Sequence, residues 1–309
     1  MPRSQSITRE EMRDALSRSG YLLETRVDTL LKRRGFFAEP NTAYEDPETG
    51  KSRELDVHAI SAMNCGRDRF DFLFRILIIE CVNNPQPLVF FTKPPVAPVL
   101  HRDAIALSGL PLKVWPEKGK WTQSVDLHRY LKMEEWHHYC RGRTASQYCS
   151  FTRKGGGQSS DWMALHEGSH FDTIKKLCDA THYFQEEHAH SWVWGVHEPV
   201  NLQIYYPILV VQGELLELRS GRPAGAVSSV GHVQYRQAVS ARGSQRYHQI
   251  DVVQERVLPK LLRQLDKERD EMCRLLTRRR SVVAMAVERI AARARRARSA
   301  ESVQKIMEP

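Results

Sequence analysis

The sequence lacks the hallmarks of membrane-spanning and disulfide-rich secreted proteins. It contains no run of about 18 apolar residues, so we expect no transmembrane helix and no membrane association. The opening stretch MPRSQSITREEMRDALSRSG has no apolar segment of the kind found in secretory signals. None of the 6 cysteines forms a C-x-x-C pair. We therefore expect reduced thiols and a cytoplasmic protein.

The composition is that of an ordinary globular protein with a basic tail. The 309 residues are enough for one large domain or two modest ones, and 41% are hydrophobic. The net charge of +9 is uneven, because the segment from Asp251 onward carries 15 Lys and Arg against 9 Asp and Glu. Such a tail favours a polyanionic partner, although a basic helix can also be a solvated surface.

The pattern of apolar residues predicts alternating helices and strands. Helices are expected at about 7–17, from Ser19 to Gly35, at Val125–Tyr139, at 170–187 and from Gln254 onward. Strands are expected at Phe36–Tyr44, SRELDVHAIS, FRILIIECV, PLVFF, NLQIYYPILVVQGELLELR and RYHQIDVV, with a hairpin turn at Gln212–Gly213. The continuous apolar run FRILIIECV predicts a central strand that is covered on both faces.

Three acidic residues stand at informative places in this pattern. Glu24 lies in the helix before the first strand, Asp56 in the second strand and Glu80 near the end of the third. Hydrolysis of a phosphodiester commonly uses a divalent cation, and Mg²⁺ prefers oxygen ligands. Asp56, Glu80 and the carbonyl of Cys81 can supply such ligands. Glu24 can bind a second metal or hold a metal-bound water.

These segments resemble the PD-(D/E)XK nucleases, the restriction-endonuclease-like superfamily. The matching stretches are GYLLETRVDTLLKRRGF, SRELDVHAIS and ILIIECVNNPQPLVFF, and the resemblance covers residues 15–95, with a looser match over 200–265. The lysine that the family places two residues after the glutamate is Val82 here. In the family its ammonium positions the attacking water and stabilises negative charge. Lys93 and Lys51 are candidates to replace it.

The resemblance implies an α/β fold with a restriction-endonuclease-like core, whose central mixed sheet is flanked by helices and extended in the second half. It predicts a domain over 1–270 with an insertion around 95–190, followed by a basic helical tail over 271–309. The implied function is Mg²⁺- or Mn²⁺-dependent cleavage of DNA, in defence or repair. The alternative is a catalytically inactive relative that binds nucleic acid or assembles with partner proteins.

Two further patterns point to other chemistry. The segment 166–170 matches HExxH, the zinc-metalloprotease motif in which two histidines on one helical face bind zinc, so a zinc hydrolase is a third possible function. Candidates for a third ligand follow at Glu186, Glu187, His188 and His190. A continuous helix is unfavourable there because Gly168 and Ser169 are poor interior residues. His137, His138, Cys140 and Cys149 could also bind zinc, but their spacing fits no standard finger.

The arginine-rich tail is the candidate nucleic-acid contact. The residues expected to bind phosphates are Arg278, Arg279, Arg280, Arg293, Arg295 and Arg296. The same helix could instead be a solvated surface or an arm that joins a second copy or a partner protein.

Overall fold

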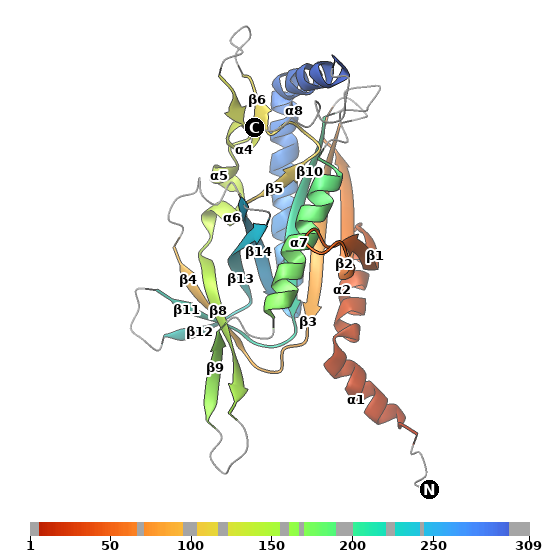
Figure 1. The fold of residues 1–309 in the computed structure, drawn as a ribbon, viewed down its shortest axis with the longest axis vertical. Helices are drawn as coiled ribbons and strands as arrows, with labels where there is room; N and C mark the ends of the chain where they lie inside the picture. The colour runs from red at the N-terminus through yellow and green to blue at the C-terminus, as the bar shows by residue number, and fades with distance from the viewer. Residues whose placement is uncertain are drawn as a thin grey trace.

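A computed structural model describes residues 6–66, 71–94, 104–116, 123–154, 161–166, 170–189, 200–220, 226–241 and 244–296 (Figure 1). The helices are α1 (Arg9–Ser19), α2 (Tyr21–Arg33), α4 (Leu127–Tyr130), α5 (Met133–Trp136), α6 (His138–Arg141), α7 (Phe171–Glu187) and α8 (Leu258–Arg296). The strands are β1 (Phe37–Glu45), β2 (Ser52–Asn64), β3 (Phe72–Val82), β4 (Leu88–Lys93), β5 (Ala106–Ser108), β6 (Lys113–Val114), β7 (Val125–Asp126), β8 (Thr144–Arg153), β9 (Trp162–His166), β10 (Asn201–Val211), β11 (Leu215–Arg219), β12 (Val227–Val230), β13 (His232–Ala241) and β14 (Ser244–Gln254).

One large mixed sheet organises the protein. Its main path runs β1-β2-β3-β10-β14-β13-β8-β4-β11-β12, with β5 paired to β10 and β9 paired to β8. The β2–β3 pair is antiparallel, whereas β3–β10 and β10–β14 are parallel. The prediction of an α/β fold with a mixed sheet, flanking helices and a C-terminal helix is therefore confirmed.

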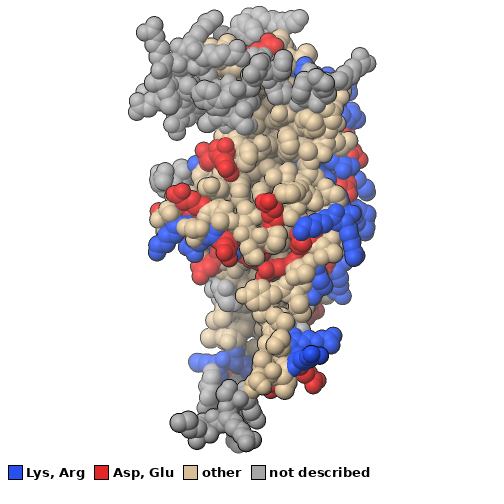
Figure 2. Space-filling view, turned by 90° about the vertical axis from the view of Figure 1, so that its right-hand side faces the viewer, with Lys and Arg blue, Asp and Glu red and all other residues tan. Residues whose placement is uncertain are grey.

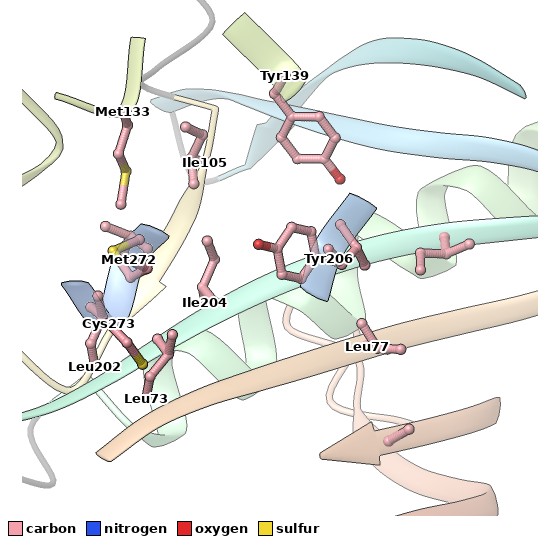
Figure 3. Packing of buried hydrophobic residues seen from close by; sticks show 14 of the residues in the cluster. Leu73, Leu77, Ile105, Met133, Tyr139, Leu202, Ile204, Tyr206, Met272 and Cys273 are labelled. Carbon is pink, nitrogen blue, oxygen red and sulfur yellow. The ribbon is translucent and has the colours of Figure 1, made fainter. Parts of the chain in front are cut away.

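Different helices cover the two faces of the sheet. Leu77 and Ile79 of β3 belong to the cluster that α2 and α8 cover, and Ile76 and Ile78 belong to the cluster that α7 covers. Side chains alternate between the faces of a strand, so a strand buried on both sides must be apolar throughout. This is why FRILIIECV forms the central strand, as its sequence predicts. Figure 3 shows Leu73 and Leu77 of β3 below Ile204 and Tyr206 of β10.

The C-terminal helix is part of the core. Leu265 and Leu275 of α8 lie on either side of the domain boundary expected at residue 270, and both are buried in one cluster. The region expected to be an insertion contributes β8, which lies between β13 and β4 in the main sheet. Among the described helices, none is long and apolar enough to cross a membrane.

Two local predictions were wrong. Gln212–Gly213 does not join a hairpin, because β10 pairs with β3, β14 and β5, while β11 pairs with β4 and β12. The helix expected over Val125–Tyr139 is the short strand β7 followed by the separate short helices α4, α5 and α6. Lys132 between two of them has a φ of 55°, a left-handed conformation that an α-helix cannot continue through.

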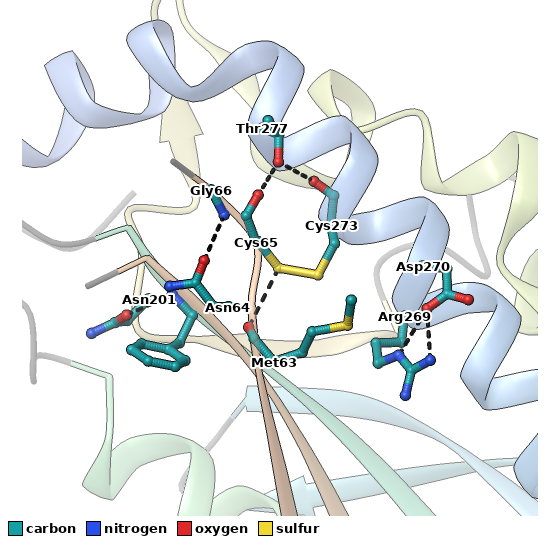
Figure 4. The surroundings of a disulfide bond; sticks show 10 residues. Met63, Asn64, Cys65, Gly66, Asn201, Arg269, Asp270, Cys273 and Thr277 are labelled. Carbon is teal, nitrogen blue, oxygen red and sulfur yellow. Dashed lines mark hydrogen bonds and ion pairs between the residues drawn. A yellow bond between two sulfur atoms is a disulfide. The ribbon is translucent and has the colours of Figure 1, made fainter. Parts of the chain in front are cut away.

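The expectation of reduced thiols is wrong for two of the cysteines. Cys65, just after β2, is disulfide-bonded to Cys273 of α8, 208 residues later in the chain (Figure 4). The Thr277 hydroxyl contacts the carbonyl oxygens of both cysteines. Such a pair leaves no short-range signature in the sequence, because only the packing of α8 beside the end of β2 brings the two thiols together.

Reduction of this disulfide is expected to lower the free energy of unfolding by about 2–5 kcal/mol, because the cross-link closes a long loop and restricts the unfolded chain. Urea denaturation with and without reductant measures the change. The double variant Cys65→Ser/Cys273→Ser should match the reduced protein and no longer respond to reductant. Cys149→Ser, which removes a free thiol, is the control and should keep the response. Equal stability of the oxidised and reduced proteins would contradict the expectation.

Candidate active site

Asp56 and Glu80 meet where β2 and β3 separate. The two strands pair from Asn64 opposite Phe72 to Val57 opposite Ile79, and their ladder ends there. Beyond that pair the carboxylates bond to the backbone of the opposite strand. Asp56 Oδ2 accepts a hydrogen bond from Cys81 N–H at 2.7 Å, and Glu80 Oε1 accepts one from Asp56 N–H at 3.2 Å. The two carboxylates are therefore held side by side at the open end of the strand pair.

A lysine from α7 completes this pair. The Lys176 ammonium lies 2.8 Å from both Glu80 oxygens and 3.7 Å from Asp56 Oδ1. The helix is fixed on the sheet by buried neighbours, Ile174 and Leu177. Glu80 is almost fully buried, but the side chains of Asp56 and Lys176 remain 21% and 26% exposed, so the site is open to solvent on one side.

Glu24 approaches the same place from α2. The helix starts after Gly20, whose φ of 86° is in the left-handed region that favours glycine. A methyl group at Gly20 would lie 3.8 Å from the Cys81 carbonyl oxygen and 3.9 Å from Glu24 Oε1. Burial raises the pKa of Glu24, and the nearby charge of Asp56 raises it further. The carboxylates of Glu24, Asp56 and Glu80 and the Cys81 carbonyl therefore lie near one another.

The electrostatics of the cluster show a deficit of positive charge. Burial and the neighbouring Asp56 raise the pKa of Glu80 to about 7, although Lys176 opposes the shift. Burial also raises the pKa of Asp56, against the hydrogen bond from Cys81 and the charge of Lys176. One ammonium does not balance three carboxylates in this partly buried place. Hard oxygen donors in such an arrangement suit Mg²⁺ or Mn²⁺.

Substituting Glu80 by glutamine is expected to stabilise the metal-free protein. Because folding raises the pKa of Glu80, its protonated form contributes stability to the folded protein. This contribution is fully present below pH 4.5, the ordinary pKa of a glutamate, and is lost as the pH rises through about 7. Glu80→Gln should therefore raise the free energy of unfolding at pH 8 by on the order of 2 kcal/mol. The gain should disappear near pH 4.

Denaturation in EDTA at both pH values measures this effect. Glu54→Gln, an exposed change on the neighbouring strand β2, is the control and should leave the stability almost unchanged. A lower stability of Glu80→Gln at pH 8 would show that the pair with Lys176 outweighs the cost of the buried charge.

Val82 and Lys176 lie on the same side of the sheet, one on β3 and the other on α7, which covers that side. Glu80 and Val82 are two residues apart on β3, so both side chains point to one face of the sheet. Val82 packs against the cluster that includes α7, the helix that carries Lys176. A lysine at position 82 would extend from the strand toward this helix. In this chain, the ammonium reaches the carboxylates from the helix instead.

The two lysines proposed from the sequence do not lie at the site. Lys93 ends β4, which is separated from β3 by β10, β14, β13 and β8 in the sheet. Lys51 is exposed in the turn before β2, five residues ahead of Asp56. Lys176 was missed because its only local signal is its place on an amphipathic helix. Its neighbour Lys175 shares that signal but pairs with Glu48 and Asp179.

The tail arginines have varied surroundings. The Arg280 guanidinium pairs with the buried Asp71, and the Arg279 guanidinium lies 4.9 Å from the centre of the Tyr130 ring. Arg278 and Arg293 are exposed, and Arg295 and Arg296 are in α8 with side chains outside the described part. Asp71 precedes β3 and Glu80 is near its end, so Arg280 is about 30 Å from the carboxylates.

The HExxH residues do not share a helical face in the described chain. His166 ends strand β9, and His170 is the N-terminal cap of α7. Glu167, Gly168 and Ser169 between them lie outside the described residues, as does His190 downstream. Two histidines bind zinc in this motif only when they are one turn apart on a helix. The arrangement therefore does not provide the metalloprotease ligand geometry.

The comparisons with known proteins identify no relative. No family model matches the sequence, and neither a curated protein nor a solved structure matches the chain significantly. The comparisons therefore give no information on the function.

Proposed function

We propose that this chain is a metal-dependent nuclease that acts on DNA and has a restriction-endonuclease-like core. The observation that carries the proposal is the contact of Lys176 with Glu80 and Asp56. The sequence resemblance leaves the site one lysine short at Val82. An ammonium 2.8 Å from the Glu80 carboxylate supplies the missing charge from another element of the fold.

Each residue at the site has a distinct role in this proposal. A bound Mg²⁺ or Mn²⁺ would activate water and offset charge on the phosphorane-like transition state. Asp56, Glu80 and the Cys81 carbonyl would hold the ion, and Glu24 would bind a second ion or orient a water. Lys176 would stabilise negative charge that develops on the phosphate, an electrostatic role that a preorganised cation performs well.

The charge of the protein is compatible with a DNA substrate. The chain carries +9, and basic residues bind phosphates through electrostatic attraction. Figure 2 shows acidic side chains near the middle of one face, with Lys and Arg side chains around them. In a nuclease, metal ions would offset the repulsion between such carboxylates and a phosphate backbone. DNA is therefore the proposed partner, with the exposed Arg278 and Arg293 of α8 as candidate contacts far from the site.

Plasmid cleavage tests the proposal. The wild-type protein with Mg²⁺ or Mn²⁺ should convert supercoiled plasmid to nicked and linear forms, and EDTA should stop the reaction. Asp56→Asn and Glu80→Gln should each abolish cleavage. Glu54→Gln is the matched control, because Glu54 is an exposed carboxylate two residues before Asp56 on β2.

Failure of cleavage has a clear interpretation. A folded wild-type protein that binds DNA but cuts neither strand with any common divalent metal would support the inactive relative instead. Cleavage that persists in both carboxylate variants would place the activity elsewhere or in a contaminant.

A further inference from the structure

A second group of possible metal ligands lies apart from the carboxylate site. His137 and His138 come from the start of α6, and Glu268 comes from α8. His138 Nδ1 is 2.8 Å from Glu268 Oε1, and His137 Nε2 is 3.7 Å from Glu268 Oε2. One ligand atom from each of the three residues can be chosen so that all lie within 4.8 Å of one another. One ion could bond to all three after small shifts of the side chains, because zinc–ligand bonds are about 2.0–2.2 Å long.

His137 provides an independent reason to expect a ligand. Its side chain is 0% exposed, and its Nε2 has no hydrogen-bond partner among the described residues. A buried polar atom without a partner costs stability, so its retention calls for an explanation. The nearest carboxylate oxygen is that of Glu268, and the distance exceeds that of a hydrogen bond. An ion between these two groups would satisfy both of them.

The surrounding hydrogen bonds resemble those that orient metal ligands. His138 Nε2 lies 3.0 Å from Asp251 Oδ2, an arrangement in which a carboxylate fixes the ring while the other nitrogen binds a metal. Tyr139 donates to Asp251 at 3.0 Å, and Gln264 donates to Glu268 at 3.2 Å. The two carboxylates are therefore held in place by further residues.

We propose that His137, His138 and Glu268 form a zinc site. Two imidazole nitrogens and one carboxylate oxygen suit Zn²⁺, whereas Mg²⁺ prefers oxygen ligands alone. Binding through His138 Nδ1 releases the proton shared with Glu268. Coordination through His137 Nε2 leaves the ring proton on Nδ1, so the ring gives up the 3.2 Å hydrogen bond that it accepts from Tyr139 N–H.

The site is structural rather than catalytic. His137 and Glu268 are buried, so the ion would be shielded from substrate, and a water would complete its tetrahedral set beside the three side chains. The ion would fasten the short helices of 127–141 to α8 in addition to the apolar packing and the His138–Glu268 contact that already join them. Asp251 next to the site lies on β14, which β10 separates from the Glu80-bearing strand β3. The inference is therefore independent of the proposed nuclease function.

Metal titration of the untagged full-length protein tests the site. After EDTA treatment and removal of the chelator, the wild type should bind one equivalent of Zn²⁺ and gain thermal stability. Co²⁺ in the same site should give the visible absorption of a tetrahedral centre. His137→Asn should weaken Zn²⁺ binding by about 10-fold or more, because one ligand is lost. It leaves the His138 contacts in place, and circular dichroism verifies its fold.

Two controls separate this site from other sources of binding. His58→Asn changes another buried histidine whose Nε2 has no hydrogen-bond partner in the described part of the chain, and it should bind Zn²⁺ as the wild type does. Asp56→Asn should likewise keep the zinc, since it alters only the carboxylate site. Absence of stoichiometric zinc, undiminished affinity in His137→Asn, or loss of zinc in Asp56→Asn would each overturn the proposal.

Discussion

Lys176→Ala is expected to reduce the rate of Mg²⁺-dependent DNA cleavage by about 100-fold or more. The ammonium lies 2.8 Å from Glu80 and 3.7 Å from Asp56. A methyl group at its place can neither attract a phosphate nor stabilise developing negative charge. The side chain is partly exposed and the helix remains anchored by its buried neighbours, so the variant should fold normally. Single-turnover cleavage, with thermal denaturation as the check on folding, measures the effect.

Matched lysine variants make this result specific. Lys175→Ala removes the adjacent lysine, which pairs with Glu48 and Asp179, and should retain most of the rate. Lys93→Ala should also retain it. The double variant Val82→Lys/Lys176→Ala should recover part of the lost rate, because position 82 faces the same side of the sheet as Glu80. A rate unaffected by Lys176→Ala would show that the lysine has only a structural role.

His138→Ala is expected to lower the free energy of unfolding by about 3–5 kcal/mol in EDTA, since it leaves buried charges without a partner. In the metal-free protein the His138 ring bridges Glu268 and Asp251, at 2.8 Å and 3.0 Å. Burial alone would lower the pKa of His138, but the two carboxylates raise it to about 10. They in turn have lowered pKa values because of this imidazolium, despite their burial. The ring therefore joins α6, β14 and α8 through charge.

Urea denaturation at neutral pH measures the loss. His232→Ala is the control, because His232 also contacts Asp251 but its side chain is 28% exposed and does not reach Glu268 in the described contacts. Its effect should be clearly smaller. Glu268→Gln combined with His138→Ala should cost less than the sum of the single changes, since both remove the same pair. A loss below about 1 kcal/mol in His138→Ala would show that water or rearranged groups replace the ring.

The sequence determined the elements that carry Glu24, Asp56 and Glu80, which follow one another closely along the chain. The alternation in SRELDVHAIS and the apolar run FRILIIECV predict two neighbouring strands, and β2 and β3 pair as antiparallel partners. Asp56 and Glu80 come together because the chain between them is short. The amphipathic pattern before these strands predicts the helix that carries Glu24. Hydrophobic periodicity is local, so it predicts elements and their buried faces well.

Only the tertiary structure decided which distant residues meet. Lys176 is 96 residues from Glu80, His138 is 130 residues from Glu268, and Cys65 is 208 residues from Cys273. Each meeting depends on the strand order of the large sheet and on which helix covers which face. Burial patterns show that α7 and α8 each have an apolar side, but not which partner that side will meet. That a valine stands two residues after Glu80 was visible in the sequence, whereas the contact of Lys176 with Glu80 became visible only once α7 was placed against β3.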